Sequence, residues 1–156
     1  MLSDPPARTA LTSISPEATT ALAERLASVT QRGDVYLLEG PVGAGKSHFA
    51  RSFIQACLPY PEDIPSPTFT LVQTYEAPDW PIWHCDLYRM SDSSELIELG
   101  LIDAMDGSVC LIEWPDRLDP AMRQGACLLS FEVSGDSARA ITLTGGSARH
   151  HAAIPA

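Results

Sequence analysis

One stretch of this sequence decides the fold: Gly40-Pro41-Val42-Gly43-Ala44-Gly45-Lys46-Ser47. It fills every fixed position of the pattern GxxxxGK followed by Ser or Thr. The apolar run Val35–Glu39 before it has the length of a strand, and Phe49–Leu58 after it has apolar residues at helical spacing. A strand, a glycine-rich turn and a helix in this order predict a phosphate-binding loop, because they aim backbone N–H groups at an anion.

Each part of this loop has a physical task. The glycines let the backbone curl so that successive N–H groups point at phosphate oxygens, and the helix adds the positive end of its dipole. We expect Lys46 to bridge the β and γ phosphates and the Ser47 hydroxyl to bind Mg²⁺. His48 would contribute its backbone N–H, and its side chain need not take part. The residues expected to bind the nucleotide here are Gly40, Gly43, Ala44, Gly45, Lys46, Ser47 and His48.

The identity of the nucleotide follows by elimination. Guanine-specific GTPases recognise the base with an Asn-Lys-x-Asp motif, but this chain has no asparagine, and its only lysine is Lys46. No aspartate is followed three residues later by glycine, which removes the other GTPase signature. We therefore predict ATP as the nucleotide.

The rest of the chain alternates between helical and strand patterns. Ser15-Pro16-Glu17 predicts the start of a helix that ends before Gly33. Strands are expected at residues 69–75, 82–86, 109–112, 127–133 and 140–143, with the last two antiparallel, and a short helix at residues 91–99. Val109–Ile112 is apolar at every position, as in a central strand buried on both faces. The expected fold is α/β: one P-loop NTPase-like domain with a mixed β-sheet flanked by helices.

Length and composition limit the number of domains and the cellular location that we expect. The 156 residues fit a single domain, for which we expect an ordered core at about residues 9–145 and a flexible tail at residues 146–156. The four cysteines have no CxxC spacing and lie in apolar stretches, as reduced core residues do. Without an apolar run of transmembrane length or a targeting segment, the expected location is the cytoplasm and no membrane contact is expected.

The charge of the chain limits its partners. Twenty acidic residues stand against ten Lys and Arg, for a formal net charge of −10. Coulomb repulsion opposes direct binding of nucleic acid to such a surface. The charge fits a metal-dependent site or a basic protein partner better.

Two acids follow apolar strands, where ligands bind in open α/β sheets. Glu113 ends the run Val109–Ile112 and is expected to hold magnesium directly or through water, although an acid at a strand end can simply be solvated. Asp86 occupies a similar position and is a second candidate for binding metal or orienting water, or else a turn residue. Thr68 lies in a proline-stiffened loop, where NTPases keep a switch that senses the γ-phosphate.

Other side chains near these positions have a functional and a structural interpretation. Arg89 and Arg117 are candidates for charge stabilisation, although surface arginines mostly form ion pairs. Trp83 and Trp114 fit packing better than base stacking, and His84 fits a satisfied buried histidine better than a ligand.

Four segments together resemble one known family, the bacterial tRNA threonylcarbamoyladenosine biosynthesis ATPases, TsaE or YjeE. The segments are Gly40–Ser47, Ser66–Val72, His84–Arg89 and Ile112–Arg117, with Glu98–Leu101 adding support. The resemblance covers about Thr9 to Gly145. The chain departs from the family at Pro41-Val42 and at His48, where other residues are common, and no donor of the phosphate loop is lost.

The resemblance implies a small ATPase that works with two partner proteins. Those partners attach a threonylcarbamoyl group to the adenosine beside the tRNA anticodon, and ATP hydrolysis resets the complex between turnovers. The ATPase is not itself the transferase and meets tRNA only through its partners. By the same likeness Lys46 and Ser47 hold phosphate and magnesium, Glu113 binds magnesium and Asp86 is needed for hydrolysis. Thr68 becomes a switch residue, and Trp114 becomes a neighbour of the nucleotide.

Two other functions remain open from the residues alone. A small-molecule or nucleotide kinase would need an arginine-rich lid, but the nine arginines are scattered and no two lie within five residues. A nucleotide-dependent binding module with negligible turnover would need no lid. Both alternatives keep the ATP site.

Overall fold

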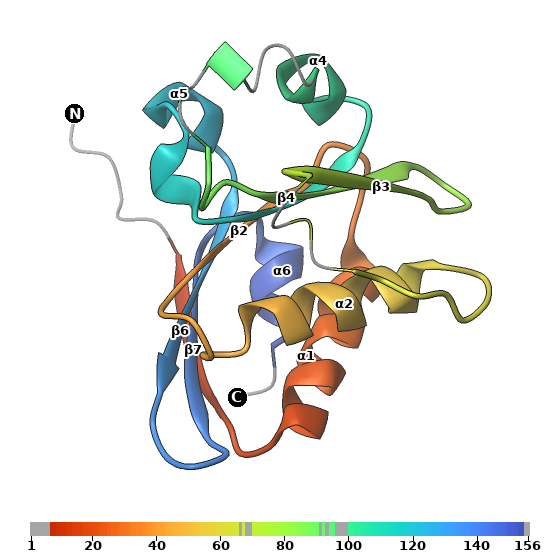
Figure 1. The fold of residues 1–156 in the computed structure, drawn as a ribbon. Coiled ribbons are helices and arrows are strands. Elements are labelled where there is room, and N and C mark those ends of the chain that lie inside the picture. Colours follow the sequence, from red (N-terminus) through yellow and green to blue (C-terminus); the bar gives the residue numbers. More distant parts are fainter. Residues whose placement is uncertain are drawn as a thin grey trace.

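A seven-stranded mixed sheet organises the molecule, with strand order β1-β7-β6-β2-β5-β4-β3 (Figure 1). The computed structural model describes residues 7–65, 67, 70–90, 92, 94–95 and 100–154. The strands are β1 (Arg8–Ser13), β2 (Val35–Glu39), β3 (Val72–Glu76), β4 (Pro81–Asp86), β5 (Val109–Glu113), β6 (Cys127–Val133) and β7 (Arg139–Gly145). The helices are α1 (Pro16–Val29), α2 (Lys46–Cys57), α4 (Leu101–Met105), α5 (Pro120–Arg123) and α6 (Ala148–Ala152), with a 3-10 turn, η1 (Pro115–Arg117).

The centre of the sheet is parallel and its edges are antiparallel. Strands β6, β2, β5 and β4 run in one direction, whereas β1, β7 and β3 pair antiparallel with their neighbours. Every residue of β5 is buried, as its apolar sequence predicts for a strand covered on both faces. The expected α/β fold with a mixed sheet flanked by helices is confirmed, and so is the antiparallel pairing of β6 with β7.

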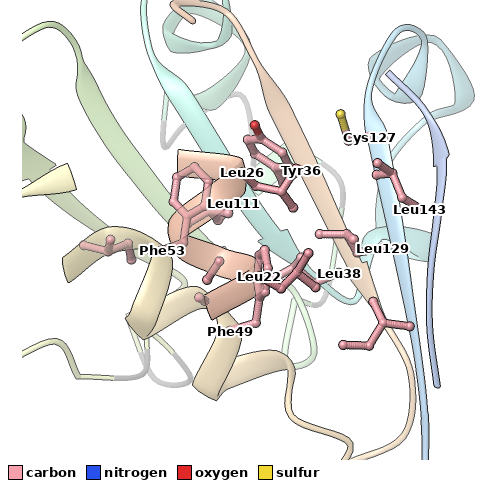
Figure 2. Close-up of a cluster of buried hydrophobic side chains, with 14 of the residues drawn as sticks. Leu22, Leu26, Tyr36, Leu38, Phe49, Phe53, Leu111, Cys127, Leu129 and Leu143 are labelled. Carbon is pink, nitrogen blue, oxygen red and sulfur yellow. The ribbon is translucent and has the colours of Figure 1, made fainter. Parts of the chain in front are cut away.

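Helices cover both faces of this sheet. Helices α1 and α2 lie on one side, while α4 and α5 lie on the other (Figure 1). Alternate residues of β2 serve the two faces: Tyr36 and Leu38 belong to the larger cluster under α1 and α2, and Leu37 to the smaller one. Figure 2 shows the larger cluster, whose labelled members are Leu22, Leu26, Tyr36, Leu38, Phe49, Phe53, Leu111, Cys127, Leu129 and Leu143. All four cysteines are free, and three of them are buried.

Helix α1 begins as its sequence predicts. Ser15 is the N-cap residue, and its hydroxyl accepts a hydrogen bond of 3.1 Å from the N–H of Ala18. The stripe of apolar residues that follows buries Leu22 and Leu26 against α2 and the sheet. This packing fixes α2 against α1, and the glycine-rich loop leads directly into the first turn of α2.

The expectation of a flexible tail is wrong for residues 147–154. Ser147 and His150 form a capping box that starts α6, and His150 is 2% exposed. The Arg149 guanidinium donates to both carboxylate oxygens of Asp34, at 2.6 Å each, while Ile154 joins the larger cluster. Polar contacts hold most of this segment, so its sequence lacks apolar periodicity. A search for hydrophobic patterns therefore does not detect the helix.

Several boundaries also differ from the expected ones. Strand β1 has no counterpart among the predicted strands, because only one of its three covered residues is apolar, namely Leu11, whereas Thr9 and Ser13 are polar. The strand expected from residue 69 begins at Val72, and Phe69 lies outside the described residues. The helix expected at residues 91–99 falls largely outside them too. None of the helices in the described part of the chain combines the length and apolar character needed to cross a membrane.

Candidate functional site

The glycine-rich loop connects the end of β2 to the first residue of α2. Gly40, Gly43 and Gly45 have φ values of +139°, +85° and +101°, a region that favours glycine. A Cβ on Gly40 would also run into the carbonyl oxygen of Phe131 on β6. Around Gly43 and Gly45 a Cβ would meet nothing within 4 Å. These two glycines are therefore required by the backbone conformation, and the space in front of them is open.

The first turn of α2 presents backbone N–H groups to that open space. The N–H of Phe49 donates to the carbonyl of Gly45 at 2.9 Å, and the glycine N-cap offers no side-chain acceptor. The N–H groups of Lys46, Ser47 and His48 precede this bond, so the helix itself supplies them with no acceptor. Such groups, together with the helix dipole, favour an anion at this position.

Lys46 reaches from the helix back over the loop. Its side chain is buried and its ammonium group donates to the carbonyl of Gly40 at 2.5 Å. The same nitrogen lies 3.6 Å from the centre of the Trp114 ring, a cation–π contact. Burial lowers the pKa of Lys46, and the negative charges of Glu113, Asp86 and Asp116 oppose that shift. The ammonium group is thus held between the loop backbone and a group of carboxylates.

Two parallel strands bring the predicted acids together. Asp86 at the end of β4 pairs in register with Glu113 at the end of β5. The Ser47 hydroxyl donates to Oε1 of Glu113 at 3.1 Å, and Oδ1 of Asp86 accepts the N–H of Tyr88 at 3.0 Å. Side-chain oxygen atoms from α2, β4 and β5 that could bind a metal thus lie together beside the loop. A set made of one hydroxyl and carboxylates suits Mg²⁺, which prefers oxygen ligands and fills its remaining positions with water and phosphate.

A second contact of Glu113 was not expected from the sequence. Nε2 of His84 lies 2.9 Å from Oε2 of Glu113, and both side chains are buried. The sequence favoured a satisfied buried histidine at this position. The histidine is buried, but its partner is the acid predicted to bind metal.

These residues border a cavity of about 460 Å³. Its lining consists of Val42, Gly43, Gly45, Lys46, Ser47, His48, Arg51, Asp86, Tyr88, Arg89, Glu113 and Trp114. Most of the site residues expected from the sequence therefore meet at one place, at the carboxyl ends of β2, β4 and β5. That is where ligands bind in open α/β sheets.

Trp114 covers one side of this cavity. It follows β5 directly and adopts φ +59°, an unusual conformation for a residue other than glycine. Its ring lies against that of Tyr88, with 5.0 Å between the ring centres, as well as over Lys46. The ring therefore packs against Tyr88, as the sequence favoured, and it also lines the cavity, while its place beside a nucleotide stays a prediction.

Some predicted site residues lie elsewhere. Ala44 is buried within the loop and does not line the cavity, and Gly40 contributes its carbonyl to Lys46 without lining the cavity. Thr68 lies outside the described residues. Arg117 donates to the carbonyl of Met90 at 3.1 Å and is absent from the lining, whereas Arg89 is part of it.

The side chain of His48 turns toward α1. Its Nε2 lies 2.9 Å from both the carbonyl oxygen of Pro16 and the hydroxyl of Thr20. The sequence left this side chain without a part in nucleotide binding, and its hydrogen bonds link α2 to α1. Tyr88 and Arg51 also line the cavity, although neither was predicted as a site residue. Tyr88 lies within the segment His84–Arg89 without a role assigned to it, and no motif marks Arg51, which α2 brings to the cavity.

Comparison with known proteins supplies an independent observation. The family described as "Threonylcarbamoyl adenosine biosynthesis protein TsaE" matches residues 13–141. The tRNA threonylcarbamoyladenosine biosynthesis protein TsaE of Bacillus subtilis (strain 168) is 38% identical over 132 residues, which cover 84% of this chain and 82% of that protein. The protein of the same name from Rickettsia bellii is 35% identical, with 83% and 90% covered. A crystal structure of YdiB from Bacillus subtilis matches with a TM-score of 0.78 and 30% identity, over 97% of this chain and 94% of that one.

Proposed function

This chain belongs to the TsaE family of threonylcarbamoyl adenosine biosynthesis proteins, and on that premise we propose that it binds and hydrolyses ATP with Mg²⁺ for that biosynthesis. The family relation supports the role in tRNA modification. The ATPase activity is supported by one observation above all. Lys46, Ser47 and Glu113 converge on one cavity beside a loop whose backbone N–H groups face the same space.

Each residue has a distinct task in this proposal. Lys46 and the N–H groups at the start of α2 hold the phosphates. Ser47 and Glu113 hold Mg²⁺, with Asp86 beside them completing the metal's surroundings or orienting the attacking water. The bound ion supplies positive charge that offsets the charge developing on the phosphates. Thr68 acts as the switch residue, and Trp114 borders the nucleotide.

The proposal includes two partner proteins and excludes direct contact with tRNA. A net charge of −10 repels a polyanion, whereas it favours a basic protein surface. The partners carry out the threonylcarbamoyl transfer, and hydrolysis by this chain drives their turnover. A protein that serves tRNA modification works where tRNA is, so the cytoplasmic location is part of the proposal.

A small-molecule or nucleotide kinase is the competing function. Two arginines line the cavity, Arg51 on α2 and Arg89 after β4. A kinase lid closes several arginines of one mobile segment over the phosphates. Two arginines from separate parts of the chain do not form such a lid, so hydrolysis is favoured.

Three hydrolysis assays test the proposal. ATP consumption is measured for the chain alone, then with both partner proteins and tRNA, and then with a panel of nucleosides and sugars. We expect slow hydrolysis alone and stimulation by the partners. The Lys46→Ala variant should lose both, while Arg25→Ala, an exposed change on α1, serves as the matched control. Phosphate transferred to a small acceptor would overturn the proposal in favour of a kinase.

A further inference from the structure

His84 and Glu113 form a buried pair between the hydrophobic core and the nucleotide cavity. His84 is 0% exposed and Glu113 is 2% exposed. The two oxygens of the Glu113 carboxylate have different partners. Oε2 lies 2.9 Å from Nε2 of His84, and Oε1 accepts the Ser47 hydroxyl at 3.1 Å. The carboxylate is therefore held from both sides.

The register of the sheet explains how these side chains meet. Strands β4 and β5 are parallel, with His84 opposite Leu111 and Asp86 opposite Glu113. Residues two apart on a strand share a face, so His84, Asp86 and Glu113 lie on the face covered by α2. The carboxylate of Glu113 extends between β4 and α2. An aspartate at residue 113, with one methylene fewer, is too short to keep both contacts.

The hydrogen bonding of the imidazole ring indicates that His84 does more than fill space in the core. Nδ1 of His84 is buried and has no hydrogen-bond partner among the described residues, so Glu113 is the ring's one hydrogen-bond partner there. Because a carboxylate only accepts, Nε2 must carry the proton and donate it. A side chain kept only for packing in this place would do better without a buried, unpaired nitrogen.

We infer that His84 is a positioning residue for the magnesium ligand: it holds Oε2 of Glu113 so that Oε1 is directed toward Ser47 and the phosphate-binding loop. The inference rests on the proposed function, because it assigns His84 to the metal that this function uses. Outer partners of this kind orient a metal ligand, and losing one costs about 10- to 100-fold in metal affinity.

The experiment measures ATP binding by calorimetry over a series of Mg²⁺ concentrations and in EDTA. Mg²⁺ is expected to increase the affinity for ATP, and the measured quantity is the Mg²⁺ concentration that gives half of this increase. For His84→Ala we expect that concentration to rise by about 10- to 100-fold. Affinity for ATP in EDTA should stay within about twofold of the unmodified protein, because the loop and Lys46 are intact. His84→Gln should restore most of the Mg²⁺ dependence, since its amide can donate from near the position of Nε2.

A second buried histidine supplies the control. His150 is 2% exposed and bonds Asp34 far from the cavity. His150→Ala should lower stability and leave the Mg²⁺ dependence unchanged, which separates positioning from a general loss of packing. Adding His84→Ala to Glu113→Ala should have no further effect on Mg²⁺ dependence, because the group that His84 positions is already absent.

The inference is overturned if folded His84→Ala has the Mg²⁺ dependence of the unmodified protein. If His84→Ala does not fold, His84→Gln and His84→Asn replace it. The shorter amide places its nitrogen near Nδ1, so equal Mg²⁺ dependence of the two variants would also overturn the inference. If Mg²⁺ does not change the ATP affinity of the unmodified protein, that result contradicts the proposed function instead.

Discussion

Lys46 is the only lysine in the chain, and in the proposed function it is the side chain that holds the phosphates. The motif alone predicted its role, because the spacing of glycines and lysine reflects a local backbone geometry. Glu113 and Asp86 could be predicted from their position after apolar strands. His84 could not be assigned, because its contact with Glu113 depends on the register between β4 and β5, which local patterns do not encode.

The protonation of Lys46 is directly measurable, since a lysine-labelled sample has one ¹³Cε signal in NMR. Burial should place its titration midpoint below the ordinary pKa of 10.5 in the free protein. Addition of ATP with Mg²⁺ should raise the midpoint, because phosphate stabilises the ammonium form. A midpoint at or above 10.5 without nucleotide would show that the amine is not desolvated as described.

Removal of the metal-binding carboxylate should separate hydrolysis from nucleotide binding. We expect Glu113→Ala to lower partner-stimulated ATP hydrolysis by about 100-fold or more. It should also largely remove the Mg²⁺-dependent tightening of ATP binding, while binding in EDTA persists through Lys46. Calorimetry and phosphate release measure the two effects, with Glu132→Ala on the exposed end of β6 as the control. Unchanged turnover would remove Glu113 from the site.

At the scale of elements, the hydrophobic patterns of the sequence predicted the helices and strands that pack through apolar residues. They missed a helix that polar contacts hold in place. Helix α1, β2 and β5 were predictable because burial imposes periodicity on their residues. Helix α6 was missed because Arg149 and His150 dock it onto Asp34 at the start of β2. The pairing joins residues more than one hundred positions apart, so no local signal reveals it.

Asp34 gives this docking a pH dependence. Its burial alone would raise the pKa, but the hydrogen bonds from Arg149 and His150 lower the pKa of this carboxyl well below its usual range. A depressed pKa means that the stabilisation is complete above the unfolded-state pKa of about 3.9 and is lost as the pH falls below it. Asp34→Asn should therefore cost about 2 kcal/mol of unfolding free energy at pH 7.

The difference between the two proteins should shrink as the pH falls from about 4 to 2, because Asp34 then binds a proton in the unfolded chain while it stays ionised in the folded one. Urea denaturation at a series of pH values measures it. ATP affinity should stay unchanged, since Asp34 lies at the other end of β2 from the phosphate-binding loop. A difference in stability that is constant from pH 7 to pH 2 would contradict the ionised pair.

At the scale of the whole molecule, the excess of acidic residues predicts that this chain does not bind tRNA by itself. With a net charge of −10, the chain alone should not retain tRNA in filter binding at low salt. A complex with the two proposed partner proteins should retain tRNA, because in the proposal those partners supply the basic surface. Micromolar binding of tRNA by the isolated chain, weakening steeply with salt, would show a direct contact that the charge argument excludes.

The whole fold was predictable as a class, because one fully buried strand and one glycine-rich loop specify a parallel centre with helices on both faces. Its strand order was not, since the antiparallel edges depend on long-range pairing of β1 with β7 and of β3 with β4. The proposed function rests on the membership of the TsaE family and on the site residues that meet at one cavity.

Repeated formation of threonylcarbamoyladenosine on tRNA tests that account most directly. The reaction contains both partner proteins, the threonylcarbamoyl donor, tRNA, ATP, Mg²⁺ and either the unmodified chain or Lys46→Ala, and modified nucleoside is counted per partner complex. The unmodified chain should sustain many turnovers, whereas Lys46→Ala should stop the reaction after about one, because the complex is not reset without ATP bound at the loop. Sustained turnover with Lys46→Ala would contradict the account.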